Sequence, residues 1–294
     1  MTAAIRPRRS VLYMPGANPR AMEKARTLPA DALILDLEDS VAPDVKAEAR
    51  QLTAETVAKG GFGPREIAIR CNTIGSAWAA DDIAMIARSG AGAVLVPKVG
   101  SADELATVRA FLAKHDAPAG LALWAMIETP LGILNVHEIA RAARHERYPL
   151  TVFVLGTNDL AKETRAALVK GRQPMLAWLS TAVIAGRAYG LDVIDGVYNA
   201  FQDQDGFREE CAQGRALGMD GKTVIHPTQI AVANEVFGPS AEEAAAAEKI
   251  VAVFERPENQ GKGAISLDGR MVELLHRDMA RRTLALRDAI AART

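Results

Sequence analysis

Eight short apolar segments rich in Val, Ile and Leu recur along this chain, separated by longer segments with helical spacing. Near-continuous apolar runs, rather than alternating apolar and polar residues, are typical of strands that are buried on both faces. Eight such strands alternating with helices favour an α/β fold, a closed parallel (β/α)8 TIM barrel, over an antiparallel sandwich. We predict the strands over residues 9–14, 32–37, 66–70, 92–97, 121–127, 151–155, 191–195 and 220–225.

The helices between these strands are predicted from apolar side chains that share one face. Over residues 101–114 this pattern begins at Ser101, which together with Glu104 fits a capping box. The same capping signal occurs at Ser240 and Glu243. Other helices are predicted over residues 19–28, 45–59, 78–89, 131–146, 174–189, 205–217 and 227–237.

The last part of the chain continues beyond the eighth strand–helix unit. We therefore divide the chain into a catalytic barrel, 1–238, and a C-terminal helical extension, 239–294. The extension is predicted as two helices, 241–256 and 271–291, joined by a flexible Gly-rich connection at 261–269. Two helices joined by a hinge are suited to packing on the barrel or to reaching into a neighbouring subunit.

Composition narrows the class of protein. The chain has 294 residues, of which 49% are hydrophobic, and a formal net charge of −1 with both signs interspersed. This excludes disorder and gives no basic stripe of the kind expected in a protein that binds nucleic acid or a membrane surface. The basic N-terminus leads into no apolar segment, and only Cys71 and Cys211 are cysteines, so we expect a cytoplasmic protein.

Acidic side chains follow two predicted strands that are neighbours in the barrel. In this fold the chemistry takes place at the C-terminal ends of the strands, where the βα loops form the open mouth. Glu128 and Asp159 lie at such ends, and two carboxylates without His or Cys nearby suit Mg²⁺, with water and substrate completing the shell. The alternative is that Asp159 caps the following helix and Glu128 pairs with Arg70.

Basic side chains are predicted at the same mouth. Arg70 ends the third strand, where a guanidinium can bind a carboxylate in a bidentate manner or stabilise an enolate. The alternative is a structural ion pair with Glu38 or Asp39, and both roles are compatible because a carboxylate behind an arginine can orient it. Lys98, after the fourth strand, either adds positive charge to the mouth or lies at its rim.

The segment after the first strand leads directly into a helix. The amides of a helix N-terminus, with Arg20 and Lys24 nearby, could hold the phosphates of a cofactor-like substrate. An ordinary βα turn is the alternative, because the segment matches no known phosphate-binding loop. His226 precedes a proline, and we expect it to shape a loop rather than to catalyse. The chain contains no HExxH, GxSxG or GxxxxGK[ST] motif.

Seven short motifs lie at successive strand ends: 9–16 (RSVLYMPG), 36–41 (DLEDSV), 70–72 (RCN), 96–99 (VPKV), 127–129 (IET), 158–160 (NDL) and 225–230 (IHPTQI). Together they resemble one known family, the citrate lyase β-subunit-like family. This family contains malyl-CoA and citramalyl-CoA lyases and belongs to the HpcH/HpaI aldolase superfamily. The match runs in order from about residue 9 to 237, and residues 258–272 are also similar.

The resemblance implies an enzyme, a Mg²⁺-dependent carbon–carbon lyase. Its substrate would be a 3-hydroxyacyl-CoA thioester such as malyl-CoA or citramalyl-CoA, which it cleaves into an acyl-CoA and a 2-oxoacid or forms by condensation. Carried over by position, Glu128 and Asp159 bind the metal, and Arg70 contacts the 2-oxoacid or the thioester enolate. Asp268 completes the active site of an adjacent subunit, which requires a homo-oligomer, a trimer or a hexamer in this family. The spacing from Glu128 to Asp159 is longer than usual, with the excess at residues 141–150.

Further residues near the predicted mouth are candidates for catalysis or for substrate binding. Glu38 joins Arg70 and Asp268 as a catalytic candidate. The substrate-binding candidates are Arg70, Arg20, Lys24, Lys98 and Asp39.

Other reactions remain open for the same residues. The site could hydrolyse the thioester of malyl-CoA or a similar compound. It could also belong to a citrate lyase β subunit that acts on an acyl carrier protein, although the segment around Asp268 resembles the enzymes that use free CoA. A pyruvate-class aldolase acting on free aldehydes would need no CoA site near Arg20 and Lys24.

Overall fold

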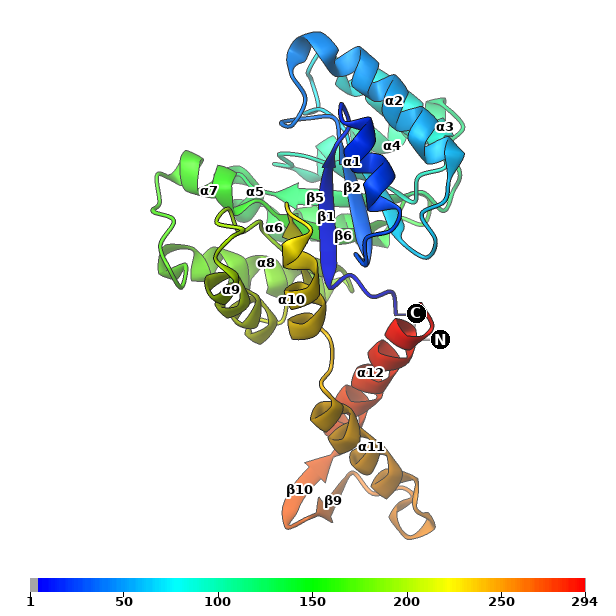
Figure 1. Cartoon of the computed structure of the whole chain (residues 1–294). Coiled ribbons are helices and arrows are strands. Elements are labelled where there is room, and N and C mark those ends of the chain that lie inside the picture. Colours follow the sequence, from blue (N-terminus) through cyan, green and yellow to red (C-terminus); the bar gives the residue numbers. More distant parts are fainter. Residues whose placement is uncertain (1–4, 294) are drawn as a thin grey trace. The chain divides into compact units, whose positions relative to one another are not determined.

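Eight parallel strands close in sequence order into a barrel, and β8 pairs with β1 (Figure 1). The computed structural model describes residues 5–293. The (β/α)8 barrel and all eight predicted strand positions are confirmed, and no strand bound differs from its prediction by more than one residue. The strands are β1 (Ser10–Pro15), β2 (Ala32–Asp36), β3 (Glu66–Arg70), β4 (Ala93–Val96), β5 (Ala122–Ile127), β6 (Leu150–Leu155), β7 (Asp192–Asp195) and β8 (Gly221–Val224).

Helices follow the strands and surround the barrel (Figure 1). Both predicted capping boxes are confirmed, at Ser101 with Glu104 and at Ser240 with Glu243. The helices of this part of the chain are α1 (Pro19–Ala25), α2 (Lys46–Lys59), α3 (Ala79–Ser89), α4 (Ala102–Lys114), α5 (Pro130–Leu134), α6 (Val136–Arg141), α7 (Thr157–Thr164), α8 (Leu176–Ala188), α9 (Gln204–Ala216) and α10 (Thr228–Phe237).

Two helical predictions were wrong in detail. The single helix predicted over 131–146 is divided into α5 and α6 at Asn135, whose side chain donates a 2.8 Å hydrogen bond to the carbonyl of Gly100. A side chain bonded to a neighbouring loop fixes the backbone where the helix would otherwise continue. The second error is α7, which the apolar pattern did not predict and which carries Asp159 in its first turn.

Alternate residues of each strand point into the barrel and fill it. The inward-facing core includes Ile34, Ala68, Trp124 and Val154, all fully buried. Because the side-chain period of a strand is two, the next inward positions on β2, β3 and β5 lie one layer nearer the mouth. The apolar interior therefore determines which polar residues face the open end.

The chain divides into two compact units, Arg8–Asn234 and a second unit formed by residues from Glu235 onward with those up to Pro7. The second unit contains α11 (Ala241–Glu255), β9 (Ala264–Leu267), β10 (Arg270–Glu273) and α12 (Leu274–Ala291). Its small core is made of Val253 and Phe254 from α11 with Ile265 and Val272 from the two strands.

The prediction of a flexible connection at 261–269 was wrong. Residues 264–273 form an antiparallel hairpin in which Leu267 pairs with Arg270 across a two-residue turn. The turn residues Asp268 and Gly269 have φ values of 49° and 75°, and an Asp-Gly pair with two positive φ values is typical of tight hairpins. The last helix begins at Leu274 rather than at 271, because the preceding residues belong to β10.

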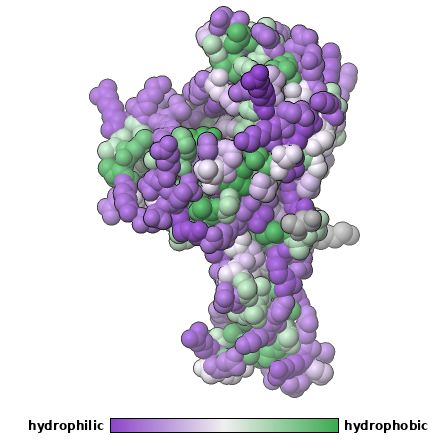
Figure 2. Space-filling model, in the orientation of Figure 1, coloured by the Kyte–Doolittle hydropathy of each residue, from purple (hydrophilic) through white to green (hydrophobic). Residues whose placement is uncertain are grey.

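Hydrophilic residues cover most of the face shown in Figure 2, with hydrophobic residues in small groups between them. Among residues 5–293, no helix is both long and apolar enough to cross a membrane.

Candidate active site

Polar side chains occupy the inward positions at the C-terminal ends of β2, β3 and β5. Asp36 ends β2 and Arg70 ends β3, and the two residues are register partners in the parallel pair. Glu128 follows β5 two residues after Met126, which belongs to the inward-facing core. These side chains therefore come together at the barrel mouth, where the sequence predicts the site.

Arg70 is held by carboxylates on two sides. Its Nε and Nη2 donate to the two oxygens of Asp36 at 2.6 and 2.7 Å, and its Nη1 lies 2.9 Å from Oε2 of Glu38. Burial opposes the charged form, but the neighbouring Tyr13 and Asp36 raise the pKa of Arg70 well above its usual value. The ion pair with Glu38, predicted as an alternative role for Arg70, is present, and Asp36 is an additional partner that the sequence did not single out.

Burial alone would raise the pKa of Asp36. The charge of Arg70 and the hydrogen bonds that Asp36 receives outweigh burial, so the pKa of this carboxyl lies below its usual value. Asp36 is therefore ionised at neutral pH, and it fixes the orientation of the guanidinium.

Glu38 links the basic residues of the mouth. Its Oε1 accepts hydrogen bonds from Lys98 Nζ at 2.5 Å and from Thr73 Oγ1 at 2.9 Å, while Oε2 faces Arg70. The residue is buried, and both carboxylate oxygens already have cationic or hydroxyl partners. Asp39 has a 56% exposed side chain, 3.6 Å from both Arg70 and Lys98. Glu38 thus organises the two cations, and Asp39 lies on their solvent side.

Lys98 connects Glu38 to Glu128. Its Nζ binds Glu38, and its backbone amide donates a 2.7 Å hydrogen bond to Oε1 of Glu128. The backbone of Lys98 has a φ of 53°, a conformation that non-glycine residues rarely adopt. Strain of this kind persists only where surrounding contacts enforce it, and it is common at functional sites.

Glu128 is the most buried acid of the candidate site, with 1% of the residue exposed. Burial raises its pKa to about 8, and the nearby Asp159 and Glu38 add to the rise, while Arg70 and the amide of Lys98 oppose it. Gly156 makes room for this carboxyl, because a Cβ at that position would lie 2.3 Å from the Cβ of Glu128 and 2.4 Å from its Oε2.

Asp159 lies in the first turn of α7, close enough to Glu128 to affect its ionisation. The helix has Gly156 at its N-cap and no side-chain cap. Within residues 5–293, the Asp159 side chain has no hydrogen bond or ion pair, and Glu128 makes no ion pair with Arg70. The structural roles that we considered as alternatives for these two acids are therefore not observed.

The donor set of the mouth fits a divalent cation. Two carboxylates, one buried and one partly exposed, offer oxygen ligands of the type that Mg²⁺ prefers, and they leave positions for water and substrate oxygens. No group of three or more His, Cys, Asp or Glu residues within the described part of the chain could hold a metal, so these two acids would be the only such side-chain ligands. The mouth also has an excess of acids, since five carboxyl groups accompany two cations: Asp36, Glu38, Asp39, Glu128 and Asp159 with Arg70 and Lys98.

The predicted phosphate-binding residues lie on α1. Arg20 and Lys24 are both exposed, and Lys24 is in the last turn of the helix. The side chain of Asn18 accepts a hydrogen bond from the amide of Ala21 and so caps the first turn. Gly16 allows the loop to pass close to β2, because a Cβ there would be 2.7 Å from the carbonyl oxygen of Asp36.

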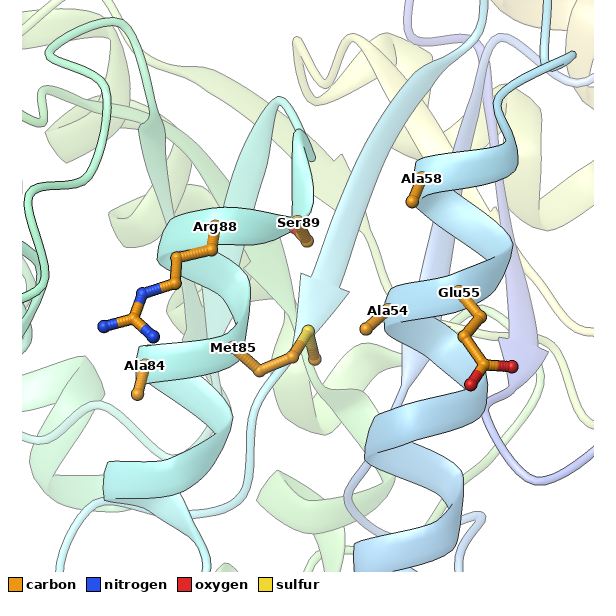
Figure 3. A pocket seen from close by; sticks show the side chains of 7 residues that line it. All are labelled: Ala54, Glu55, Ala58, Ala84, Met85, Arg88 and Ser89. Atoms are coloured by element: carbon orange, nitrogen blue, oxygen red, sulfur yellow. The ribbon is translucent and has the colours of Figure 1, made fainter.

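The remaining catalytic candidate lies in the second unit. Asp268 is exposed at the tip of the β9–β10 hairpin, whereas the other candidates belong to the barrel unit. A groove of about 450 Å³ between α2 and α3 (Figure 3) contains none of the predicted site residues, and its lining is Ala54, Glu55, Ala58, Ala84, Met85, Arg88 and Ser89.

Comparison with known proteins agrees with this arrangement. The HpcH/HpaI aldolase/citrate lyase family matches residues 9–227, which span the eight strands and the mouth residues described above. The chain belongs to this family. It is thus an enzyme related to the citrate lyase β subunit, and the resemblance found in the seven motifs is confirmed.

Three similar proteins are informative. A (3S)-malyl-CoA thioesterase of Cereibacter sphaeroides is 48% identical over 286 residues, covering 97% of this chain and 96% of the relative. An L-malyl-CoA/β-methylmalyl-CoA lyase of the same species is 33% identical and covers 92% and 91% of the two chains. The crystal structure of CitE from Mycobacterium tuberculosis in complex with magnesium, acetoacetate and coenzyme A has a TM-score of 0.74, with 28% identity and coverage of 94% and 97%.

Proposed function

We propose that this protein is a Mg²⁺-dependent thioesterase that hydrolyses malyl-CoA or a similar 3-hydroxyacyl-CoA. The observation that carries the proposal is the pair Glu128 and Asp159, two acids next to Arg70 that form no ion pair with any residue between 5 and 293. The motifs alone favour the lyase reaction, with hydrolysis as the alternative. The chain is 48% identical to a malyl-CoA thioesterase but 33% identical to a malyl-CoA lyase, which supports hydrolysis ahead of carbon–carbon cleavage.

Glu128 and Asp159 would hold Mg²⁺, which would supply Lewis-acid polarisation at the hydroxycarboxylate end of the substrate. The crystallised CitE with bound magnesium, 28% identical to this chain, supports this assignment. Glu128 would lose its proton on binding the ion, because the liganding form of a carboxyl group is the carboxylate. Lys98 would keep Glu128 oriented through its amide hydrogen bond.

Arg70 would bind negative charge on the substrate. Its hydrogen bonds to Asp36 and to the sulfur of Met126 use three of the five guanidinium N–H groups, and Nη1 also forms an ion pair with Glu38. The remaining N–H on Nη2 is available for a substrate carboxylate or for the thioester oxygen as negative charge develops there. A well-oriented donor of this kind contributes roughly 3–4 kcal/mol to transition-state stabilisation.

Hydrolysis requires water to attack the thioester carbon, so that a C–O bond forms, the C–S bond breaks and CoA leaves as a thiol after gaining a proton. Asp268 would accept the proton of the attacking water. A carboxylate removed from bulk water is a stronger base, which favours a covered position for Asp268 during the reaction. We propose that the extension carrying Asp268 serves a neighbouring subunit in a homotrimer or hexamer.

The outer residues would bind the CoA portion. Arg20 and Lys24 are exposed cations on the helix after β1 and would neutralise phosphate groups. Lys98 is bound to Glu38 and would act on the substrate mainly as a nearby charge, and Asp39 would lie at the rim of the occupied pocket.

The test is incubation of the purified protein with (3S)-malyl-CoA, with and without Mg²⁺. We expect Mg²⁺-dependent release of free thiol together with malate, followed by a thiol reagent and by mass spectrometry. The substitutions E128Q and D159N should abolish the Mg²⁺-dependent rate. The substitution K59M, at an exposed position on α2, should leave it unchanged. Absence of any Mg²⁺-dependent turnover of malyl-CoA would contradict the proposal.

Carbon–carbon cleavage is the second candidate, supported by the 33% identity to a malyl-CoA lyase and by the buried, oriented Arg70. In that reaction the substrate hydroxyl loses its proton, the C–C bond breaks, and the electron pair forms an enolate on the acyl-CoA fragment that Asp268 protonates. The products would be an acyl-CoA and a 2-oxoacid instead of free CoA and a hydroxyacid. The same incubation distinguishes the two outcomes directly.

A further inference from the structure

One buried lysine, next to the loop that follows β2, lies in none of the seven motifs and has no role in the proposed reaction. Lys46 begins α2, is buried, and donates 2.9 Å hydrogen bonds from Nζ to the carbonyl oxygens of both Leu37 and Glu38. A buried ammonium group that donates hydrogen bonds to two backbone carbonyls of one loop holds that loop in place.

The loop after β2 is bound from its other side by Asp36. The two carboxylate oxygens of Asp36 accept hydrogen bonds from the backbone amides of Glu38 at 2.9 Å and of Ser40 at 3.1 Å. The amides of the loop thus face an anion, while its carbonyls face the cation of Lys46. The peptide dipoles are aligned between two opposite charges, which favours one loop conformation over others.

Acidic residues and an aromatic ring surround the ammonium of Lys46. Burial lowers its pKa below the usual value, Asp36, Asp82 and Glu38 offset part of this, and the ring of Trp78 lies 5.1 Å from Nζ. An aromatic face at this distance attracts an ammonium and limits the directions in which it can move.

We propose that Lys46 is a positioning residue for the active site, and that it acts through Glu38. The side chain of Glu38 holds Arg70 at 2.9 Å and Lys98 at 2.5 Å, so a shift of the Glu38 backbone moves both cations. Lys98 in turn binds Glu128 through its amide, which extends the effect to the acid that we assign to the metal. The inference rests on the proposed function for its catalytic consequence but not for its effect on the loop.

The experiment compares K46M, which keeps the length of the side chain without its donors, with K46R, which restores a cation. The matched control is K59M, because Lys59 lies on the same helix with a 70% exposed side chain. Hydrogen exchange followed by mass spectrometry measures the loop directly. In K46M we expect the amides of residues 38–41 to exchange at least about tenfold faster than in the wild type. K59M should show no change in this peptide.

Kinetics then tests the link to catalysis. Displacement of catalytic groups by about 1 Å lowers rates by up to about 100-fold, so kcat of K46M should fall about 10- to 100-fold with little change in KM. K46R should recover part of the loss. In the background of Glu38→Ala the penalty of K46M should shrink, because the residue through which it acts is truncated.

Each outcome bears on a different claim. Unchanged loop exchange in K46M would overturn the role of Lys46 in holding the loop, whatever the activity. Faster exchange with an unchanged kcat would overturn its role in catalysis. If the wild type hydrolyses no acyl-CoA, the proposed function fails, and the exchange experiment alone decides whether Lys46 holds the loop.

Discussion

The guanidinium of Arg70 binds the carboxylate of Asp36 through two parallel hydrogen bonds of 2.6 and 2.7 Å, across neighbouring strands of the barrel. Both residues are buried, and they are register partners at the ends of β3 and β2. Because the geometry is set by the sheet itself, Arg70 has little freedom to reorient when a substrate enters. The pair therefore holds the guanidinium in a fixed orientation at the candidate site.

Removal of Asp36 should be far more harmful than removal of Asp39, although both are near Arg70. Asp36→Ala leaves a buried guanidinium without its main partner, and breaking a buried pair in this way destabilises proteins by about 3–5 kcal/mol. Asp39→Ala removes an exposed carboxylate 3.6 Å away, and such pairs contribute about 0–1 kcal/mol. Denaturant unfolding of the two variants measures the difference, and equal destabilisation would show that the Asp36 pair has no special role.

Glu128 should make the effect of Mg²⁺ depend on pH. Its pKa in the folded protein is raised to about 8, so the folded state binds this proton more tightly than the unfolded chain does. The stability that this provides is fully present below the ordinary pKa of a glutamate and is lost as pH rises through the folded pKa. Mg²⁺ binds the ionised form, so it must displace a proton below about pH 8 but not above it.

We therefore expect the increase in Tm on addition of Mg²⁺ to grow between about pH 6 and about pH 8.5 and then to level off. Thermal unfolding at a fixed Mg²⁺ concentration across this range tests the expectation. In E128Q the group cannot ionise, and the increase in Tm should be small at every pH. An increase in wild-type Tm that is independent of pH would exclude Glu128 as a ligand that is protonated in the free protein.

Gly156 should be intolerant of a single methyl group. In Gly156→Ala the new Cβ would meet the side chain of Glu128 at 2.3–2.4 Å, so the carboxyl group must move. We expect a loss of about 1–3 kcal/mol in stability, the range for overpacking, and loss of the stabilisation by Mg²⁺. Gly120→Ala is the matched control, because nothing lies within 4 Å of a Cβ at that position. Mg²⁺ stabilisation that survives in Gly156→Ala would argue against Glu128 as a ligand.

The sequence predicted the barrel well because the signal for each strand is local. Apolar runs such as 32–37 and 151–155 identify strands without knowledge of their neighbours, and the rule that chemistry lies at strand ends selects Arg70, Glu128 and Asp159. What the sequence did not specify is that Asp36, rather than Glu38 or Asp39, is the main partner of Arg70. That depends on the register between β2 and β3, which only the folded barrel defines.

Other features were missed for different reasons. The hairpin at 264–273 has only Ile265 and Val272 buried, so its strands carry no periodic pattern, and only the Asp268-Gly269 pair indicates the turn. Lys46 carries no signal in the sequence, because a lysine at the start of a helix is usually exposed. Its burial results from the position of the loop after β2, which is a tertiary feature.

Asp268 offers a test of the proposed sharing of the active site between subunits. Asp268→Asn keeps a residue that tolerates the left-handed backbone of the turn, where φ is 49°, so the hairpin should remain folded and Tm should be unchanged. Loss of the carboxylate should lower kcat by about 100-fold or more, since general acid–base groups contribute about 10²- to 10⁴-fold.

If Asp268 of one subunit serves the mouth of another, two impaired variants should complement each other. In mixed oligomers of D268N and E128Q, some sites combine an intact Glu128 with an intact Asp268 from a neighbour. Co-refolding or co-expression of the two variants should therefore raise the rate well above the small residual rate of D268N and the absent rate of E128Q alone. No recovery in oligomers that demonstrably contain both variants would mean that Asp268 acts within its own chain or takes no part in the reaction.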